Sequence, residues 1–150
     1  MREEPHVVGE TWLKAMNYLG EGLADEARRH GTIQVIRRGF RTSTVQSFAR
    51  RTKLPQHEIL HLLRLPKATY SRKLKQGDQL AADTSDRLFR LARITVRAEE
   101  VFGDEAVALD WLRTPNQALG AERPYDLLDT DAGVEAVEDE LGRIEYGVYA

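Results

Sequence analysis

The sequence predicts an all-α protein, and three observations lead to this prediction. Apolar residues recur mostly three and four positions apart, the spacing that places them on one face of a helix. Few segments show the alternation of apolar and polar residues that is typical of half-buried strands. Glycine and proline stand at the ends of the apolar segments, where helices begin and end. With 150 residues, 41% of them hydrophobic, the chain is long enough to bury a core.

The first predicted helix spans residues 9–27, where apolar residues keep helical spacing although Gly20 and Gly22 weaken the helix. We interpret it as a docking helix or a loosely attached arm. A short apolar segment, residues 33–36, comes next, and Gly39 follows shortly after it. Glycine commonly closes a helix, so this segment fits a short helix, but it fits a strand equally well.

Three short helices are expected next. Thr42 and Ser43 offer N-cap side chains ahead of the first, because a hydroxyl oxygen accepts a bond from a free backbone N–H there. The second should begin at Pro55, since proline lacks the N–H that has no partner in a first helical turn. By the same argument Pro66 starts the third helix, which Gly77 ends.

Further helices are predicted in the rest of the chain. A long one follows the polar stretch 78–85 and stops at Gly103. An acidic helix with Leu109 and Leu112 comes next. After a turn-rich stretch, Thr130 caps a final helix whose apolar residues line one side.

Charge is distributed unevenly along the chain. Residues 1–27 carry a net charge of −4, residues 28–93 +12 and residues 94–150 −10, within an overall −2. Such asymmetry indicates two different partners, of which the one for the basic middle is a polyanion. Two other readings remain open: the oppositely charged parts attract each other, or the charges only keep the surface solvated.

The composition also bears on the compartment. Without cysteine the chain has no disulfide and no thiolate zinc site. The N-terminus is acidic where a signal peptide is basic, and no apolar run approaches the about 20 residues of a membrane span. We therefore expect a cytoplasmic protein that has no membrane contact and no cofactor.

The basic middle has the layout of a helix-turn-helix, because three short helices lie between residues 43 and 76. The segment 58–77 resembles the helix-turn-helix of Xre-type repressors, except that Arg64 stands where such turns usually carry a small residue or glycine. Arg72 suits a guanine edge, and the lysines suit phosphates. The predicted DNA-binding residues are Lys67, Ala68, Thr69, Ser71, Arg72, Lys73, Lys75, Arg50 and Arg51. The alternative is a basic three-helix unit that does not bind DNA.

One motif indicates a different function. Residues 57–61, His-Glu-Ile-Leu-His, match H-E-x-x-H, in which two histidines on one helical face bind zinc and the glutamate activates water. A protease also needs a third ligand, and no histidine follows His61, so a carboxylate such as Asp83 or Glu99 would have to serve. The leucines of the same helix are expected to pack in the core. We expect no metal site and no catalytic residue, and we keep a zinc protease as the weakest alternative.

An ordered pattern fills the last third of the chain and resembles the toxin-binding module of the Xre antitoxins that accompany RES-domain toxins. The matching positions are Phe102, Gly103, Ala106, Trp111, Leu112, Pro115, Asn116, Leu119, Gly120, Pro124, Leu127, Leu128, Thr130, Gly133, Val137, Leu141, Ile144 and Gly147. Weaker similarity extends back to Ile33, and Ala121 replaces a second glycine often found there. The physical character of Trp111, Leu112, Leu127 and Leu128 favours core positions for all four.

The resemblance implies an antitoxin that binds a RES toxin, an NAD-consuming protein with an ADP-ribosyltransferase-like fold, and covers its active site. The implied toxin-binding residues are Arg143, Glu145, Tyr146, Gly147, Val148, Tyr149 and Ala150. It also implies operator binding, a homodimer and a higher toxin–antitoxin hetero-oligomer. The expected domains are an N-terminal arm (1–30), an Xre-like helix-turn-helix (31–83) and a toxin-binding domain (84–150). The alternatives are a helix-turn-helix regulator without a toxin partner and a chain end that is only frayed.

Overall fold

A computed structural model describes residues 9–147 of the chain, and within this range it contains helices and isolated bridges but no strand, which confirms the all-α prediction. The elements are α1 (Glu10–Leu19), α2 (Leu23–His30), α3 (Thr32–Arg38), α4 (Thr44–Thr52), α5 (Gln56–Leu63), α6 (Lys67–Gln76), α7 (Ala82–Phe102), α8 (Glu105–Arg113), the 3₁₀ helices η1 (Gln117–Leu119) and η2 (Pro124–Leu127), and α9 (Asp131–Tyr146). No helix among these residues is both long and apolar enough to span a lipid bilayer.

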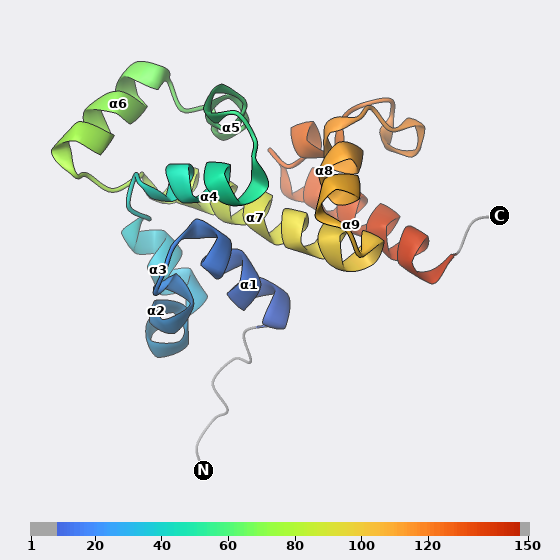
Figure 1. Cartoon of the computed structure of the whole chain (residues 1–150), viewed down its shortest axis with the longest axis horizontal. Helices are drawn as coiled ribbons and strands as arrows, with labels where there is room; N and C mark the ends of the chain where they lie inside the picture. Colours follow the sequence, from blue (N-terminus) through green and yellow to red (C-terminus); the bar gives the residue numbers. More distant parts are fainter. Residues whose placement is uncertain (1–8, 148–150) are drawn as a thin grey trace, which may run out of the picture.

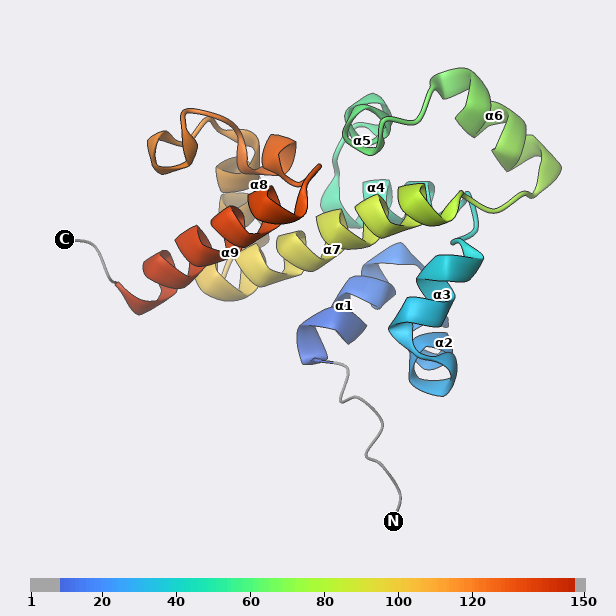
Figure 2. The same ribbon diagram turned by 180° about the vertical axis from the view of Figure 1, so that it is seen from behind.

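The long helix α7 is the centre of the fold. Figures 1 and 2 show α1 and α3 along one side of α7 and α8 and α9 beside its C-terminal half, while α5 also contacts α7 and α4 packs on α1 and α5. Side chains around the circumference of α7 are buried, among them Leu88, Leu91 and Ile94. A helix that is apolar on several faces needs neighbours on several sides. The basic and the acidic parts of the chain therefore pack on the same helix.

The N-terminal helix differs from its prediction. Residues 9–27 do not form one continuous helix, because α1 ends at Leu19 and α2 begins at Leu23. Gly22 between them has φ +85°, a left-handed conformation that glycine adopts without steric cost. The turn lets α1 pack along α7, where the rings of Trp12 and Phe89 form a T-shaped pair with 5.4 Å between centroids. The segment that fitted either a helix or a strand is a helix, α3.

Some helix ends are as predicted. Thr130 caps α9, since its Oγ1 accepts a hydrogen bond of 3.0 Å from the backbone N–H of Gly133. A Cβ on Gly133 would lie 1.7 Å from the backbone oxygen of Leu127, so only glycine allows this close approach. Gly77 and Gly103 end α6 and α7 in the left-handed conformation.

Other helix starts differ from the sequence prediction. The Ser43 side chain makes no capping bond to α4, and the Thr42 hydroxyl donates instead to the backbone oxygen of Asp78 at 2.7 Å. Pro55 and Pro66 are the N-cap residues of α5 and α6, so both helices begin one residue later than expected. The helix α7 starts at Ala82, inside the polar stretch 78–85 that it was expected to follow.

Candidate DNA- and protein-binding surfaces

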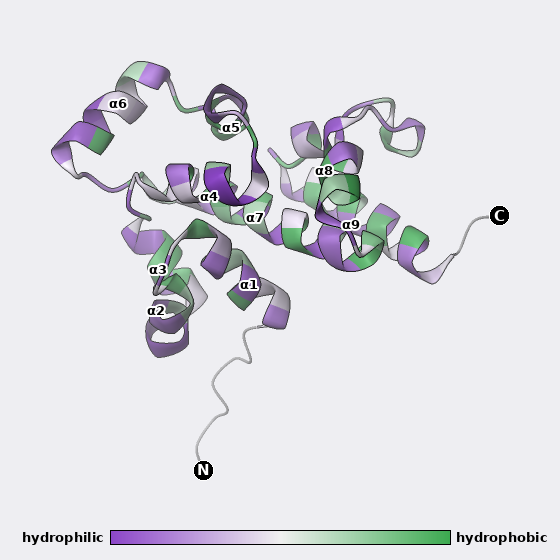
Figure 3. Ribbon diagram, in the orientation of Figure 1, coloured by the Kyte–Doolittle hydropathy of each residue, from purple (hydrophilic) through white to green (hydrophobic). Residues whose placement is uncertain are grey.

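The helix α6 lies at the edge of the fold with one face open to solvent (Figure 1). Tyr70 turns inward and is buried, and Leu74 is half-buried beside it. Figure 3 shows that most of α6 is hydrophilic. Of the α6 residues predicted to bind DNA, Lys67, Ala68, Ser71, Arg72 and Lys75 are exposed, while Thr69 and Lys73 are half-buried. The Lys73 ammonium donates to the backbone oxygen of Gln79 at 3.0 Å. This exposed face of α6 is the one that could enter a groove of DNA.

Arg64, the unusual residue of the predicted helix-turn-helix, lies in the turn between α5 and α6. This residue ends α5 with φ +55°, the left-handed conformation that glycine usually supplies. Its guanidinium lies 2.8 Å from the carboxylate of Asp129, in the segment before α9. Arg64, which stands in place of the usual glycine, is therefore joined to the C-terminal part of the chain by an ion pair.

Arg50 and Arg51, both predicted to contact DNA, have different surroundings. The Arg51 guanidinium lies 2.8 Å from Glu105 and 4.3 Å from the ring centre of Tyr18, and the hydrogen bond to Glu105 raises the pKa of Arg51. Arg50 is exposed and has no carboxylate partner among the described residues, although its Nη2 lies 3.4 Å from the Ser47 hydroxyl. A DNA contact stays a prediction for both residues, but Arg51 already has partners inside the protein.

A second contact near Arg51 joins α1 to α7. The Tyr18 hydroxyl donates a hydrogen bond to the carboxylate of Glu99. Burial raises the pKa of both side chains, because it disfavours their charged forms. Glu99, which was considered as a metal ligand, is thus bonded to the N-terminal helix.

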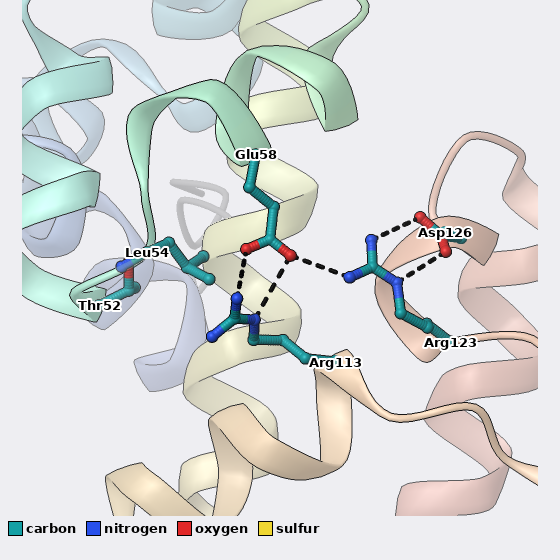
Figure 4. Close-up of polar contacts among 6 residues, drawn as sticks. All are labelled: Thr52, Leu54, Glu58, Arg113, Arg123 and Asp126. Carbon is teal, nitrogen blue, oxygen red and sulfur yellow. Dashed lines mark hydrogen bonds and ion pairs between the residues drawn. The ribbon is translucent and has the colours of Figure 1, made fainter.

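Glu58, the glutamate of the H-E-x-x-H motif, lies between the two halves of the chain (Figure 4). Its carboxylate lies 2.9 Å from the guanidinium of Arg123 and 3.0 Å from that of Arg113, and only 10% of the side chain is exposed. Arg123 also binds Asp126, and the hydrogen bonds from Arg123 lower the pKa of that carboxyl. Glu58 therefore links α5 to the C-terminal part of the chain, a role that its motif does not predict.

The histidines of the motif are placed differently. His57 and His61 are both exposed on α5. Among residues 9–147 there is no group of three or more histidine, aspartate or glutamate side chains that could hold a metal ion. Asp83, the other candidate for a third ligand, accepts a bond from the backbone N–H of Thr84.

Replacing Glu58 with glutamine is expected to destabilise the fold. The variant removes the charge that holds Arg113 and Arg123, and a mostly buried charge pair that loses one partner is costly. Because both arginines are partly exposed, we expect a loss of about 2 kcal/mol in unfolding free energy rather than the full cost of a buried pair. Thermal denaturation should show a midpoint lower by roughly 4–8 °C.

The matched control for this prediction is Asp25→Asn. Asp25 pairs with Arg28 on α2, where both side chains are more than half exposed, so the change should stay within about 0.5 kcal/mol. Equal midpoints for E58Q and D25N would contradict a structural role for Glu58.

The C-terminal module has its own small core. Leu112 and Leu128 are buried as expected, whereas Leu127 is half-buried. Trp111 is also half-buried, and its ring packs on Phe102 with 5.7 Å between centroids. It thus covers the edge of the core rather than its centre, which differs from the sequence prediction.

The end of α9 presents the residues predicted to bind a toxin. Glu145 makes two hydrogen bonds to Arg97, of 2.6 and 3.0 Å, and these lower the pKa of Glu145. Arg143 pairs with Glu140 at 3.2 Å. Tyr146 is 77% exposed. Gly147 closes the helix with φ +64°. The remaining predicted residues, Val148, Tyr149 and Ala150, lie outside the described residues.

Comparison with known proteins agrees with this two-part arrangement. Residues 32–93 match the family model of the antitoxin Xre-like helix-turn-helix domain, and residues 97–147 match that of the antitoxin Xre/MbcA/ParS C-terminal toxin-binding domain. The boundary between the two matches falls inside α7. The first domain thus ends and the second begins on one continuous helix.

Several curated proteins are similar to this chain over most of its length. Antitoxin Xre of Yersinia enterocolitica is 32% identical over 123 residues, which cover 80% of this chain and 83% of the relative. The Prs ADP-ribosylating antitoxin of a Sphingobium species is 31% identical and covers 79% of this chain and 80% of the relative. Antitoxin Xre of Pseudomonas putida is 37% identical over a shorter region, 55% of this chain and 52% of the relative. This chain therefore belongs to the Xre family of antitoxins, with a helix-turn-helix domain and a C-terminal toxin-binding domain.

Proposed function

We propose that this antitoxin binds a RES-domain toxin that degrades NAD and neutralises it by covering the toxin's active site with its C-terminal end. The observation that carries the proposal is the match of residues 97–147 to a toxin-binding domain, together with the exposed Tyr146 at the end of that domain. The name of the Sphingobium relative couples an antitoxin to ADP-ribosylation, a reaction that takes its ADP-ribosyl group from NAD. An NAD-consuming partner fits this link.

The support of α9 fits such a role. The helix is joined to α7 by an ion pair between Arg93 and Glu138 and by the two bonds between Arg97 and Glu145. A helix end that is fixed before binding loses less conformational freedom when it binds, and this favours affinity. Tyrosine is a frequent source of interface energy because it combines a large apolar ring with a hydroxyl. We therefore place Tyr146 at the start of the toxin contact.

In the same proposal, α6 binds operator DNA and the protein represses its own operon. Arg72 and Lys75 are exposed on α6, which lies within the residues that match the helix-turn-helix domain, and we assign α6 the role of the recognition helix. Helix-turn-helix proteins usually read paired half-sites, which requires a homodimer. Binding of a toxin to each C-terminal domain would then form a larger hetero-oligomer.

Co-expression tests the toxin half of this proposal. The probe is the RES-type reading frame adjacent to the antitoxin gene, expressed alone and together with this chain. The toxin alone should lower cellular NAD and stop growth, and co-expression should restore both and yield a complex that co-purifies. Growth arrest and NAD loss that persist despite co-expression would contradict the proposal. Absence of any such reading frame would favour a regulator without a toxin partner.

A further inference from the structure

Most arginines among residues 9–147 form an ion pair with a carboxylate. Those without a carboxylate partner in this range are Arg29, Arg37, Arg38, Arg41, Arg50 and Arg72. All of them lie between positions 29 and 72, and residues 28–57 contain no aspartate or glutamate. The unpaired positive charge is thus concentrated on the helix-turn-helix domain.

Arg37, Arg38 and Arg41 form a cluster that we call the arginine corner, at the end of α3 and the start of the loop to α4. All three are exposed. Arg38 and Arg41 line a hollow of about 470 Å³ together with hydroxyl side chains at the start of α4. Glu21 and Glu26 line the same hollow, but neither carboxylate pairs with the corner in the described structure. The corner therefore keeps cationic groups available to an external anion.

The arginine corner is fixed beside the segment that follows α6. Arg41 and Gln79 form an antiparallel bridge, and the Leu80 N–H donates to the backbone oxygen of Phe40 at 2.8 Å. Gly39 has φ +87°, and a Cβ there would lie 2.1 Å from the oxygen of Leu80, so the approach requires glycine. Figures 1 and 2 show the end of α3 near the segment that joins α6 to α7. The distance from the corner to α6 is thus set by backbone contacts.

The opposite end of α6 has a different electrostatic environment. A groove of about 940 Å³ runs between the α5–α6 turn and the C-terminal domain. Glu122, Asp126 and Asp129 line this groove together with Arg64 and Lys67, and Asp129 and Asp126 pair with Arg64 and Arg123 there. A polyanion that approaches α6 therefore meets carboxylates near the start of the helix and unpaired arginines near its end.

We propose that the arginine corner binds phosphates of duplex DNA while α6 occupies the groove. This inference rests on the proposed DNA-binding function and assigns it residues that lie outside α6. The guanidinium group presents a planar set of donors that matches phosphate oxygens, and phosphate contacts fix the position of a protein on the duplex without reading sequence. An acidic protein surface is the competing partner, and the experiment separates the two.

The test uses the full-length protein and the variants Arg38→Gln, Arg41→Gln and their combination. Two duplexes of equal length serve as probes: the DNA directly upstream of the antitoxin gene and a random sequence. Binding is measured by fluorescence anisotropy across a salt series. Each lost phosphate contact should lower the slope of log affinity against log salt by about 0.9. Affinity for both duplexes should fall by the same factor, roughly 2- to 5-fold per arginine.

Lys14→Gln is the matched control. It removes one exposed positive charge from α1, where Lys14 pairs with Glu100, and it should leave the salt slope unchanged. If the wild type binds DNA and the corner variants keep its slope, the inference is wrong while the DNA-binding function stands. If those variants lose toxin binding instead, the corner serves a protein partner and the inference is also wrong. A wild type that binds neither duplex would overturn both the DNA-binding function and this inference.

Discussion

A chain that ends at Tyr146 is expected to lose neutralisation of its toxin while it keeps its fold. The deletion starts at Gly147 and removes the last residues of the C-terminal end, which we propose to cover the active site. A few central residues usually supply most of an interface's binding energy, at 2 kcal/mol or more each. The dissociation constant of the complex should therefore rise at least about 100-fold, as measured by titration calorimetry.

The thermal midpoint and the DNA affinity of the truncated chain serve as controls. The buried residues of α9, among them Val137 and Leu141, remain in place, so the thermal midpoint should not change. DNA affinity should also stay the same, because α6 is untouched. A second variant, Tyr146→Ala, isolates the exposed ring from the residues that follow it. A truncated chain that still neutralises the toxin would show that the contact lies elsewhere, for example around the exposed Val107 on α8.

Charge reversal at Arg72 and Lys75 is expected to abolish DNA binding. Both side chains are exposed on the open face of α6, and glutamate at these positions replaces attraction to phosphate and base edges with repulsion. A bidentate arginine–guanine contact alone contributes about 1–3 kcal/mol of discrimination, and phosphate contacts add to it. A mobility-shift assay at fixed salt should show an affinity at least about 100-fold lower.

Toxin binding provides the control for this double variant. Since the residues that match the toxin-binding domain, 97–147, do not include α6, the variant should still form a complex with the toxin and unfold at the wild-type temperature. Operator binding that survives the double reversal would show that α6 is not the reading helix. It would favour a basic three-helix unit whose charges serve another purpose.

Features that depend on a few neighbouring residues could be predicted from the sequence. The Thr130 cap and the glycines that end α6 and α7 follow from local chemistry. The break between α1 and α2 also had a local signal in its two glycines. It was predicted only as a weakening, because packing on α7 decides whether the chain turns there.

Features that depend on distant residues could not be predicted. Glu58 is part of a zinc motif in the sequence, but its partners Arg113 and Arg123 come from a different domain. Arg51 likewise looks like a free cation until Tyr18 and Glu105 are placed beside it. Ion pairs of this kind follow from tertiary packing, and sequence spacing carries no information about them.

The arginine corner had a signal that the sequence prediction did not use. The predicted DNA-binding residues were chosen from α6 and α4, although the stretch without acidic residues begins before α3. Without the fold, nothing indicates that the end of α3 lies beside the end of α6. The bridge between Arg41 and Gln79 supplies that information.

An NAD assay with purified proteins tests whether this antitoxin blocks an NAD-degrading RES toxin through its C-terminal end, as we propose. The toxin is mixed with NAD and increasing amounts of either the intact chain or the chain that ends at Tyr146. NAD consumption should stop when the intact chain reaches a stoichiometric amount and should continue with the truncated chain. Undiminished consumption in the presence of saturating intact chain would show that the chain does not neutralise such a toxin.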